Sequence, residues 1–241
     1  MSAIDSAREG VLAFGDSITH GGGPLQRDIA SQSWALWTAR GLGLPFTSYA
    51  VDGATMAEVA SEQVSAWRER SARPHARYDL GCLYAGANDV RTPDWDAAAF
   101  GARHREVMAV LAGCCDRVLT PTIPLDLGRP RAVRAVEEAN REIEAAAAEH
   151  GALVVDLRDL GGAEHVAADH IHPTAFGQVE IAERALDVLA RAGAEIKVRP
   201  TALLRPKANT PARAAGARAR YAGAEARVLA RAAAKRLLRR R

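Results

Sequence analysis

Short apolar runs alternate with longer helical patterns up to about Ile196, and this alternation constrains the fold more than any other feature. The runs lack interior proline, as expected of strands that are buried on both faces of a parallel sheet. The expected strands are Val11 to Phe14, Thr47 to Val51, Leu80 to Ala85, Arg117 to Thr120 and Leu153 to Leu157. Strands joined by crossover helices predict an α/β fold, a three-layer α/β/α sandwich with a five-stranded parallel sheet in flavodoxin-like order.

The helices between these strands have recognisable ends. Thr55-x-x-Glu58 is a capping box that opens one helical segment. Asp94 precedes the next helical pattern, and Pro130 suits the first position of the one after it. Thr174 is placed to cap the last helix of this region. Loops therefore follow the strands at their carboxyl ends, where open parallel sheets bind their ligands.

Charge divides the chain into an acidic body and a basic tail. Fourteen of the 32 Lys and Arg residues lie from Lys197 onward beside one acid, Glu225, which gives the tail a charge of +13 and the preceding body −10. We expect one main domain over residues 1–196, because a chain with 48% hydrophobic residues can bury one sizeable core. A linker rich in Pro, Ala and Arg is expected over 197–223, and a basic tail with a helical pattern over 224–241.

The prolines of the linker, Pro200, Pro206 and Pro211, are expected to break any helix there. In the tail, one helical face is apolar, with Ala226, Leu229, Ala230, Ala233 and Leu237. Arginine and lysine line another face. Such a helix is capable of contacting an anionic membrane, a nucleic acid or an acidic surface, the acidic body included; the alternative is a solvated extension.

No targeting or metal-binding pattern is evident. The segment Met1 to Gly10 contains no apolar run, and no stretch approaches the roughly 20 apolar residues of a transmembrane segment. The cysteines are Cys82, Cys114 and Cys115, an odd number without metal-ligand spacing. These features favour a cytoplasmic location, in a reducing compartment.

A serine, a histidine and an aspartate form the candidate catalytic set. A serine hydroxyl is a poor nucleophile unless a base takes its proton, and the base works best when a third group fixes its tautomer. Ser17 follows the first expected strand, so its hydroxyl should stand at the carboxyl edge of the sheet. Asp169 and His172 lie three residues apart, a spacing that lets the carboxylate reach Nδ1 and leaves Nε2 for the serine. His170 is the competing base, but its ring would tend to point elsewhere.

Acyl transfer also requires hydrogen-bond donors for the oxygen that becomes negative. Gly53 follows the second expected strand, and its missing side chain lets a backbone N–H approach closely. Asn88 follows the third strand and offers a neutral side-chain NH₂. Together with the backbone N–H of Ser17, these groups would form an oxyanion hole of three donors.

Four short blocks carry a resemblance to a known family: Gly15-Asp16-Ser17-Ile18-Thr19, Gly53, Gly86-x-Asn88-Asp89 and Asp169-x-x-His172-Pro173. With these blocks in this order, the chain resembles the SGNH or GDSL-type serine hydrolases, and the resemblance covers roughly residues 10 to 195. Ile18 stands where the family's short name has Leu. The resemblance implies an α/β/α fold and hydrolysis of esters or thioesters without a metal or cofactor. It assigns the catalytic roles to Ser17, Asp169 and His172 and the oxyanion hole to Ser17, Gly53 and Asn88.

The main hypothesis is therefore a serine esterase that hydrolyses a small-molecule carboxylic ester or thioester through an acyl-enzyme on Ser17. One alternative keeps the site and changes the reaction, to an acyltransferase or a carbohydrate O-deacetylase. The other alternative is a non-catalytic binding module that acts through the basic tail.

Overall fold

The computed structural model describes residues 8–70, 76–128 and 131–238. Five parallel strands form one sheet in the order β2-β1-β3-β4-β5. They are β1 (Val11–Gly15), β2 (Phe46–Ser48), β3 (Tyr78–Tyr84), β4 (Cys115–Pro121) and β5 (Leu153–Val155). The α/β class, the five-stranded parallel sheet and its flavodoxin-like order are confirmed, and every strand lies within a few residues of its expected position.

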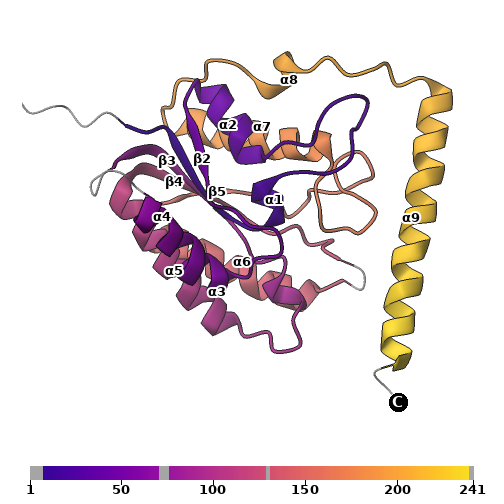
Figure 1. The fold of residues 1–241 in the computed structure, drawn as a ribbon, viewed down its shortest axis with the longest axis horizontal. Helices are drawn as coiled ribbons and strands as arrows, with labels where there is room; N and C mark the ends of the chain where they lie inside the picture. The colour runs from indigo at the N-terminus through magenta and orange to yellow at the C-terminus, as the bar shows by residue number, and fades with distance from the viewer. Residues whose placement is uncertain (1–7, 71–75, 129–130, 239–241) are drawn as a thin grey trace, which may run out of the picture.

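Helices cover both faces of the sheet, which completes the three layers (Figure 1). On one face, α2 (Trp34–Leu42) packs against α7 (Ala175–Arg191). The other face is covered by α3 (Met56–Glu58), the π-helical turn η1 (Val59–Gln63), α4 (Val64–Arg70), α5 (Ala97–Cys114) and α6 (Val133–His150). Two short elements follow strands at their carboxyl ends, α1 (Ser17–His20) and the 3-10 turn η2 (Asp89–Arg91).

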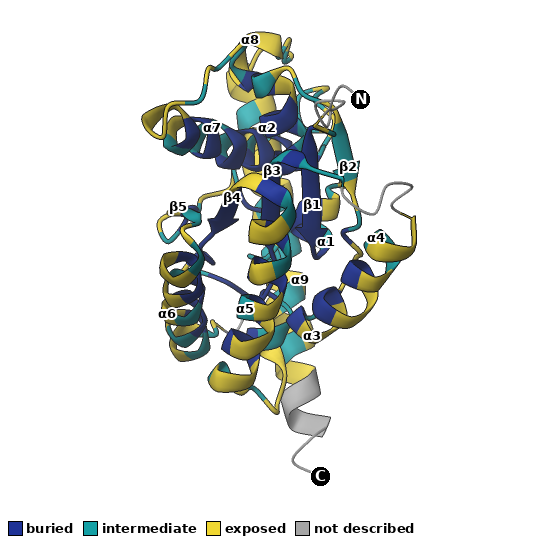
Figure 2. Ribbon diagram, turned by 90° about the vertical axis from the view of Figure 1, so that its left-hand side faces the viewer, coloured by how far each residue is buried: buried dark blue, intermediate teal, exposed yellow. Residues whose placement is uncertain are grey.

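The sheet forms the centre of the core. All five residues of β1 are buried, because this strand has neighbours on both sides and helices on both faces. Figure 2 shows similar burial on most of β3 and β4 and on the inward sides of α2, α5 and α7. Fully burying a side chain such as Leu12 or Phe14 stabilises the fold by about 1.5 to 3 kcal/mol. The strand ends are thereby held rigidly, which fixes the loops that follow them.

Two helix boundaries follow the expected caps and one does not. The capping box of Thr55 and Glu58 is present, and Thr174 accepts a hydrogen bond from the N–H of Gly177 at the start of α7. The prediction that Asp94 opens the next helix is wrong. Asp96 caps α5, because its Oδ1 atom accepts hydrogen bonds from the N–H groups of Ala98 and Ala99. Pro130 lies outside the described residues.

The expected linker, 197–223, contains one short helix and the beginning of a second, so the prediction that its prolines exclude helix is wrong. Pro200 and Pro211 are the first residues of α8 (Pro200–Leu203) and α9 (Pro211–Leu238). The first turn of a helix tolerates proline, because an N–H at that position has no partner within the helix. The residues before α8 are attached to the body: the N–H groups of Lys197 and Val198 both donate to the carbonyl of Gly41.

Helix α9 begins at Pro211 instead of near residue 224, and it lies beyond the loops at the carboxyl edge of the sheet (Figure 1). Its predicted apolar face is uncovered, since Ala226, Leu229, Ala230 and Ala233 are exposed. The residues turned towards the body include Tyr221, Glu225 and Val228. Over the described ranges, no helix has both the length and the apolarity required to cross a bilayer.

Candidate active site

Ser17 lies at a tight turn between β1 and α1. Asp16 caps this helix, since its Oδ1 atom accepts a hydrogen bond of 2.9 Å from the N–H of Ile18. The turn requires glycine before the cap. Gly15 has φ +154°, and a Cβ there would lie 2.3 Å from the carbonyl oxygen of Tyr84. Ser17 is thus the first residue of a short helix at the carboxyl end of a central strand.

Two buried glutamines hold this turn from opposite sides. Gln63, in the π-helical turn η1, accepts a hydrogen bond from the N–H of Gly15 at 3.0 Å and donates to its carbonyl at 2.8 Å. Gln178, on α7, donates to the carbonyl of Ile18 at 2.9 Å and accepts from the N–H of Trp34 at 2.8 Å. These bonds fix the backbone on both sides of Ser17, so the hydroxyl is displayed from a rigid turn.

The structure brings Ser17, His172 and Asp169 into one hydrogen-bonded chain. Ser17 Oγ lies 3.0 Å from Nε2 of His172. On the other side of the ring, Nδ1 of His172 lies 2.7 Å from Oδ2 of Asp169. The second carboxylate oxygen, Oδ1, accepts hydrogen bonds from the N–H groups of Ile171 and His172, at 2.9 and 3.1 Å. The aspartate therefore orders its own loop as well as the imidazole.

Asp169 and His172 each stabilise the charged form of the other. The hydrogen bond with Asp169 raises the pKa of His172, although partial burial acts in the opposite direction. Burial alone would raise the pKa of Asp169, but the hydrogen bonds from His172 and from the loop backbone outweigh it and lower the pKa to about 2. The carboxylate is therefore ionised across the working pH range and favours a proton on the imidazole.

Asp16 is a second carboxyl beside the serine, with a different environment. It is fully buried, and one of its oxygens, Oδ2, has no hydrogen-bond partner in the described part of the protein. Burial raises its pKa to about 7, although the hydrogen bond from Ile18 opposes this shift. Asp16 thus titrates near neutral pH directly beside the expected nucleophile.

The expected oxyanion donors lie on the loops that follow β2 and β3. Gly53 has φ +78°, a conformation that favours glycine, and its Cβ position faces open space. Asn88 uses one side-chain N–H to bond the carbonyl of Ala54 at 3.0 Å, which leaves its second N–H for a ligand. Asp89 accepts two hydrogen bonds from the N–H of Met56, at 3.0 and 3.1 Å, and so ties the loop after β3 to the loop after β2.

Ser17 and His172 open into a pocket of about 470 Å³. It is lined by the glycine-rich segment 21–26, by Asp52 and by the loop around Asp169. The segment adds apolar surface at the mouth, where the side chain of Leu25 is 68% exposed. A pocket of this size accommodates a small to medium-sized ester.

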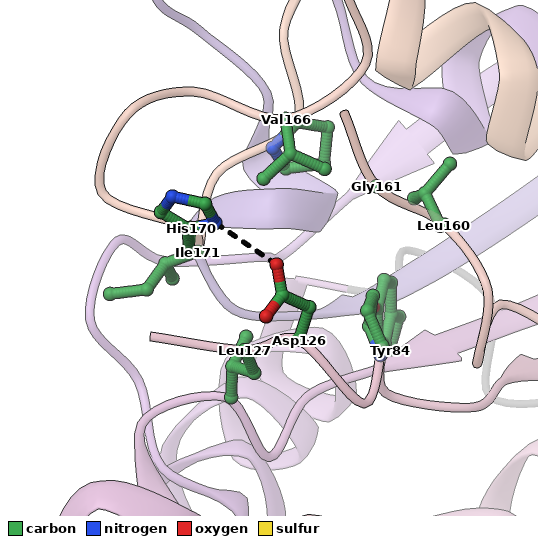
Figure 3. Close-up of a pocket in the computed structure, with 10 residues that line it drawn as sticks. Tyr84, Asp126, Leu127, Leu160, Gly161, Val166, His170 and Ile171 are labelled. Atoms are coloured by element: carbon green, nitrogen blue, oxygen red, sulfur yellow. Dashed lines mark hydrogen bonds and ion pairs between the residues drawn. The ribbon is translucent and has the colours of Figure 1, made fainter. Parts of the chain in front are cut away.

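The competing base, His170, is turned away from Ser17. It has φ +57°, and its Nδ1 atom lies 3.2 Å from Oδ2 of Asp126 (Figure 3). Its Nε2 atom lies 2.7 Å from Oε1 of Glu225 on α9.

Over residues 8–70, 76–128 and 131–238, no group of three or more His, Cys, Asp or Glu residues is placed to hold a metal ion.

The sequence reasoning missed the residues that support this site. Gln63 and Gln178 occur within otherwise apolar helical patterns, and a polar residue at such a position is the signal that could have identified them. The pairing of His170 with Asp126 and Glu225 has no comparable local signal, because these residues lie 44 and 55 positions away.

Solved structures show the same fold. A lipolytic protein of the G-D-S-L family from Veillonella parvula is 23% identical, with a TM-score of 0.60 over 76% of this chain and 98% of that chain. The lipase/acylhydrolase from Enterococcus faecalis is 19% identical (TM-score 0.59, 80% and 100% covered). An acetylxylan esterase from Geobacillus stearothermophilus is 20% identical (TM-score 0.57, 75% and 94% covered). A comparison with curated proteins gives no match.

Membership of a family is shown by the sequence itself. The model of the GDSL-like Lipase/Acylhydrolase family matches residues 13–179, which include the end of β1, the turn at Ser17 and the loop of His172. This range covers more than half of the chain and ends inside α7. The chain therefore belongs to the GDSL-like lipase/acylhydrolase family, the SGNH hydrolases, and is a carboxylic ester hydrolase of that family.

Proposed function

We propose that the protein hydrolyses carboxylic esters or thioesters through an acyl-enzyme on Ser17. The observation that carries this proposal is the chain of two contacts, 3.0 Å from Ser17 Oγ to His172 Nε2 and 2.7 Å from His172 Nδ1 to Asp169 Oδ2. Both distances lie within the hydrogen-bond range expected of a nucleophile, its base and the group that orients the base.

The reaction follows from this geometry. As Ser17 Oγ bonds to the substrate carbonyl carbon, its proton passes to Nε2 of His172, and the charge on the imidazolium is balanced by Asp169. When the carbon–oxygen bond of the ester breaks, the same proton passes to the leaving alcohol. Water then attacks the carbonyl carbon of the acyl-enzyme and gives a proton to His172. The imidazolium passes this proton to Ser17 Oγ as the bond between Oγ and the acyl carbon breaks, which releases the acid and restores the serine.

The negative oxygen of the tetrahedral intermediate would be held by three donors. They are the N–H of Ser17, the N–H of Gly53 and the remaining side-chain N–H of Asn88. Neutral donors that are fixed in advance stabilise this charge without the cost of reorganising water. The bonds from Asn88 to Ala54 and from Met56 to Asp89 support the fixed arrangement.

A panel of aryl esters, from acetate to palmitate, tests the proposal on the wild type and on Ser17→Ala. The wild type should hydrolyse at least the short esters, and the variant should lose activity by three orders of magnitude or more, about the loss that follows removal of a serine nucleophile. A Ser17→Ala protein that keeps its fold and most of its rate would overturn the proposal. The mechanism uses no metal, so a chelator should leave the rate unchanged.

The alternatives are separated by product analysis. An acyltransferase would yield a new ester when a competing alcohol is supplied, and a carbohydrate O-deacetylase would release acetate from acetylated sugars faster than from aryl acetates. A binding module that acts through the tail would show no turnover in either assay. The acetylxylan esterase among the similar structures makes acetylated sugars a reasonable addition to the panel.

A further inference from the structure

Helix α9 is attached beside the active-site pocket by the single acidic residue of the basic tail. Glu225 Oε1 lies 2.7 Å from Nε2 of His170, whose side chain is 11% exposed. The ring of Tyr221 packs edge-on against the same imidazole, with 6.1 Å between the ring centres. His170 belongs to the loop of Asp169 and His172, so the helix is positioned relative to the catalytic residues and not free in solvent.

This attachment creates a second hollow, of about 540 Å³, between the body and the N-terminal half of α9. On the body side it is lined by residues of segment 25–28 and by Ala163 and Glu164. The helix supplies residues between Arg213 and Tyr221. Leu25 and Gln26 line both this hollow and the pocket of Ser17, so the two cavities share a wall.

The shared wall is held in place by Gln26. Its side chain donates to the carbonyl of Glu164 at 2.8 Å and accepts from the N–H of Phe176, at the start of α7, at 3.0 Å. Its backbone forms two further hydrogen bonds with Ile29. A molecule that passes over the exposed side chain of Leu25 would therefore extend from the serine into the second hollow.

The charges around the hollow leave an excess of three cations. Arg27 pairs with Glu164 at 3.7 Å, and Lys207 pairs with Asp28 at 2.5 Å, so both acids of the hollow are neutralised. The remaining charged groups are Arg213, Arg218 and Arg220. In the described part of the chain, none of these three guanidinium groups forms an ion pair. They are exposed and lie on one stretch of a single helix.

We propose that the ester hydrolysed at Ser17 carries a phosphate group, which Arg213, Arg218 and Arg220 bind in the hollow between α9 and the body. This proposal rests on the proposed esterase function. A phosphate monoester is close to a dianion at neutral pH and matches several guanidinium groups better than a single carboxylate does. The pocket of Ser17 and the hollow beside α9 together fit a small soluble phosphate ester. Its acyl group would lie at Ser17 and its phosphate at α9.

Kinetics on a matched pair of substrates tests the proposal. Monoacetyl glycerol and monoacetyl glycerol 3-phosphate differ only in the phosphate. Each exposed arginine contact should improve kcat/KM by about twofold, so that the wild type prefers the phosphorylated ester by about tenfold in low salt. The preference should shrink at high salt, because exposed charges are screened. Equal kcat/KM values for the two esters would overturn the proposal.

The helix offers a matched control for charge. Arg218→Gln/Arg220→Gln should remove most of the preference, and Arg227→Gln/Arg231→Gln, which removes two exposed arginines of the same helix outside the hollow, should keep it. Glutamine is nearly as good a helix former as arginine, so both variants should keep α9. Equal loss in the two variants would mean that net charge, and not the hollow, determines the preference, and the proposal would be wrong.

Direct binding separates this proposal from the esterase function itself. In low-salt calorimetry, the inactive Ser17→Ala protein should bind glycerol 3-phosphate about tenfold more tightly than glycerol, and Arg218→Gln/Arg220→Gln in the same background should lose most of this difference. This readout needs no turnover, so an inactive wild type would count against the proposed function alone. If the protein binds phosphatidylglycerol vesicles but not glycerol 3-phosphate, the arginines face a lipid surface, and the proposal of a soluble substrate fails.

Discussion

Gln63 forms two hydrogen bonds with one residue, accepting from the N–H of Gly15 and donating to its carbonyl. Gly15 ends β1 and precedes Asp16 and Ser17, so a side chain 48 residues away sets the backbone from which the proposed nucleophile is displayed. Because Gln63 is buried, removing its side chain would leave the N–H and the carbonyl of Gly15 without these partners inside the protein.

Replacing Gln63 by alanine should therefore lower both stability and activity. A buried donor and a buried acceptor would lose their partners, which should cost about 2 to 4 kcal/mol in the free energy of unfolding. Urea unfolding and kcat on an aryl acetate measure the two effects. Glu62→Ala, an exposed change one residue earlier, should alter stability by less than about 0.5 kcal/mol. Similar losses in both variants would contradict a role for the side-chain bonds.

The pH dependence of kcat/KM should follow His172. Only the neutral imidazole accepts the serine proton, and the bond with Asp169 raises the pKa of His172, so activity should rise with pH with a midpoint above 6.5. Asp169→Asn removes this shift. Its midpoint should fall, and its rate should drop by about 10² to 10⁴.

A control is needed because Asp16 titrates in the same range. The variant Asp16→Asn cannot titrate, so a midpoint that stays above 6.5 in this variant belongs to His172. A profile that is flat between pH 5 and 8 in the wild type, with chemistry limiting the rate, would exclude His172 as the base.

Asn88→Ala should lower kcat by about 10² to 10³ and change KM much less, because the donor acts on charge that develops in the transition state. The bond to Ala54 is lost as well, so the unfolding free energy should be measured beside the rate. Asn88→Asp keeps the shape but places a carboxylate near the developing oxyanion, and it should be at least as slow. If Asn88→Ala raises KM and leaves kcat unchanged, the side chain binds substrate instead of the oxyanion.

The stability of the fold should depend on pH through Asp16. Burial raises its pKa from the ordinary value of 3.8 to about 7 in the folded protein. Between these values the unfolded chain has lost a proton that the folded protein still holds, so stability falls as pH rises through this window. Asp16→Asn removes the titration and should gain about 3 to 4 kcal/mol relative to the wild type between pH 4 and 8. Urea unfolding measures both free energies of unfolding. If the wild type and Asp16→Asn differ by the same amount at every pH between 4 and 8, the pKa of Asp16 is not raised.

The sequence was sufficient to predict the sheet and to place the expected site residues at its carboxyl edge. The strands are short and apolar because both of their faces are covered, and this pattern is visible without a structure. Ser17, Gly53 and Asn88 each follow a strand, and parallel strands bring their carboxyl ends to one edge. The three-residue spacing of Asp169 and His172 predicted that the carboxylate contacts Nδ1 of the imidazole, and the two atoms lie 2.7 Å apart.

The exact start of helix α5 and the position of helix α9 could not be predicted from such patterns. Asp94 and Asp96 are equally good caps by residue type, and only the geometry of the loop selects Asp96. The position of α9 depends on the contact between Glu225 and His170, which joins two segments far apart in the sequence. Alanine and arginine are favourable at almost any exposed helical position, so their pattern did not identify which side of α9 faces the body.

Labelling by a fluorophosphonate, which reacts with an activated serine hydroxyl, tests the central claim most directly. Intact-mass analysis followed by peptide mapping should show one adduct, on Ser17, in the wild type. Ser17→Ala should show none, and His172→Ala should react at least 100-fold more slowly. An adduct on another residue, or equal labelling of His172→Ala and the wild type, would contradict the assignment of Ser17 as a nucleophile activated by His172.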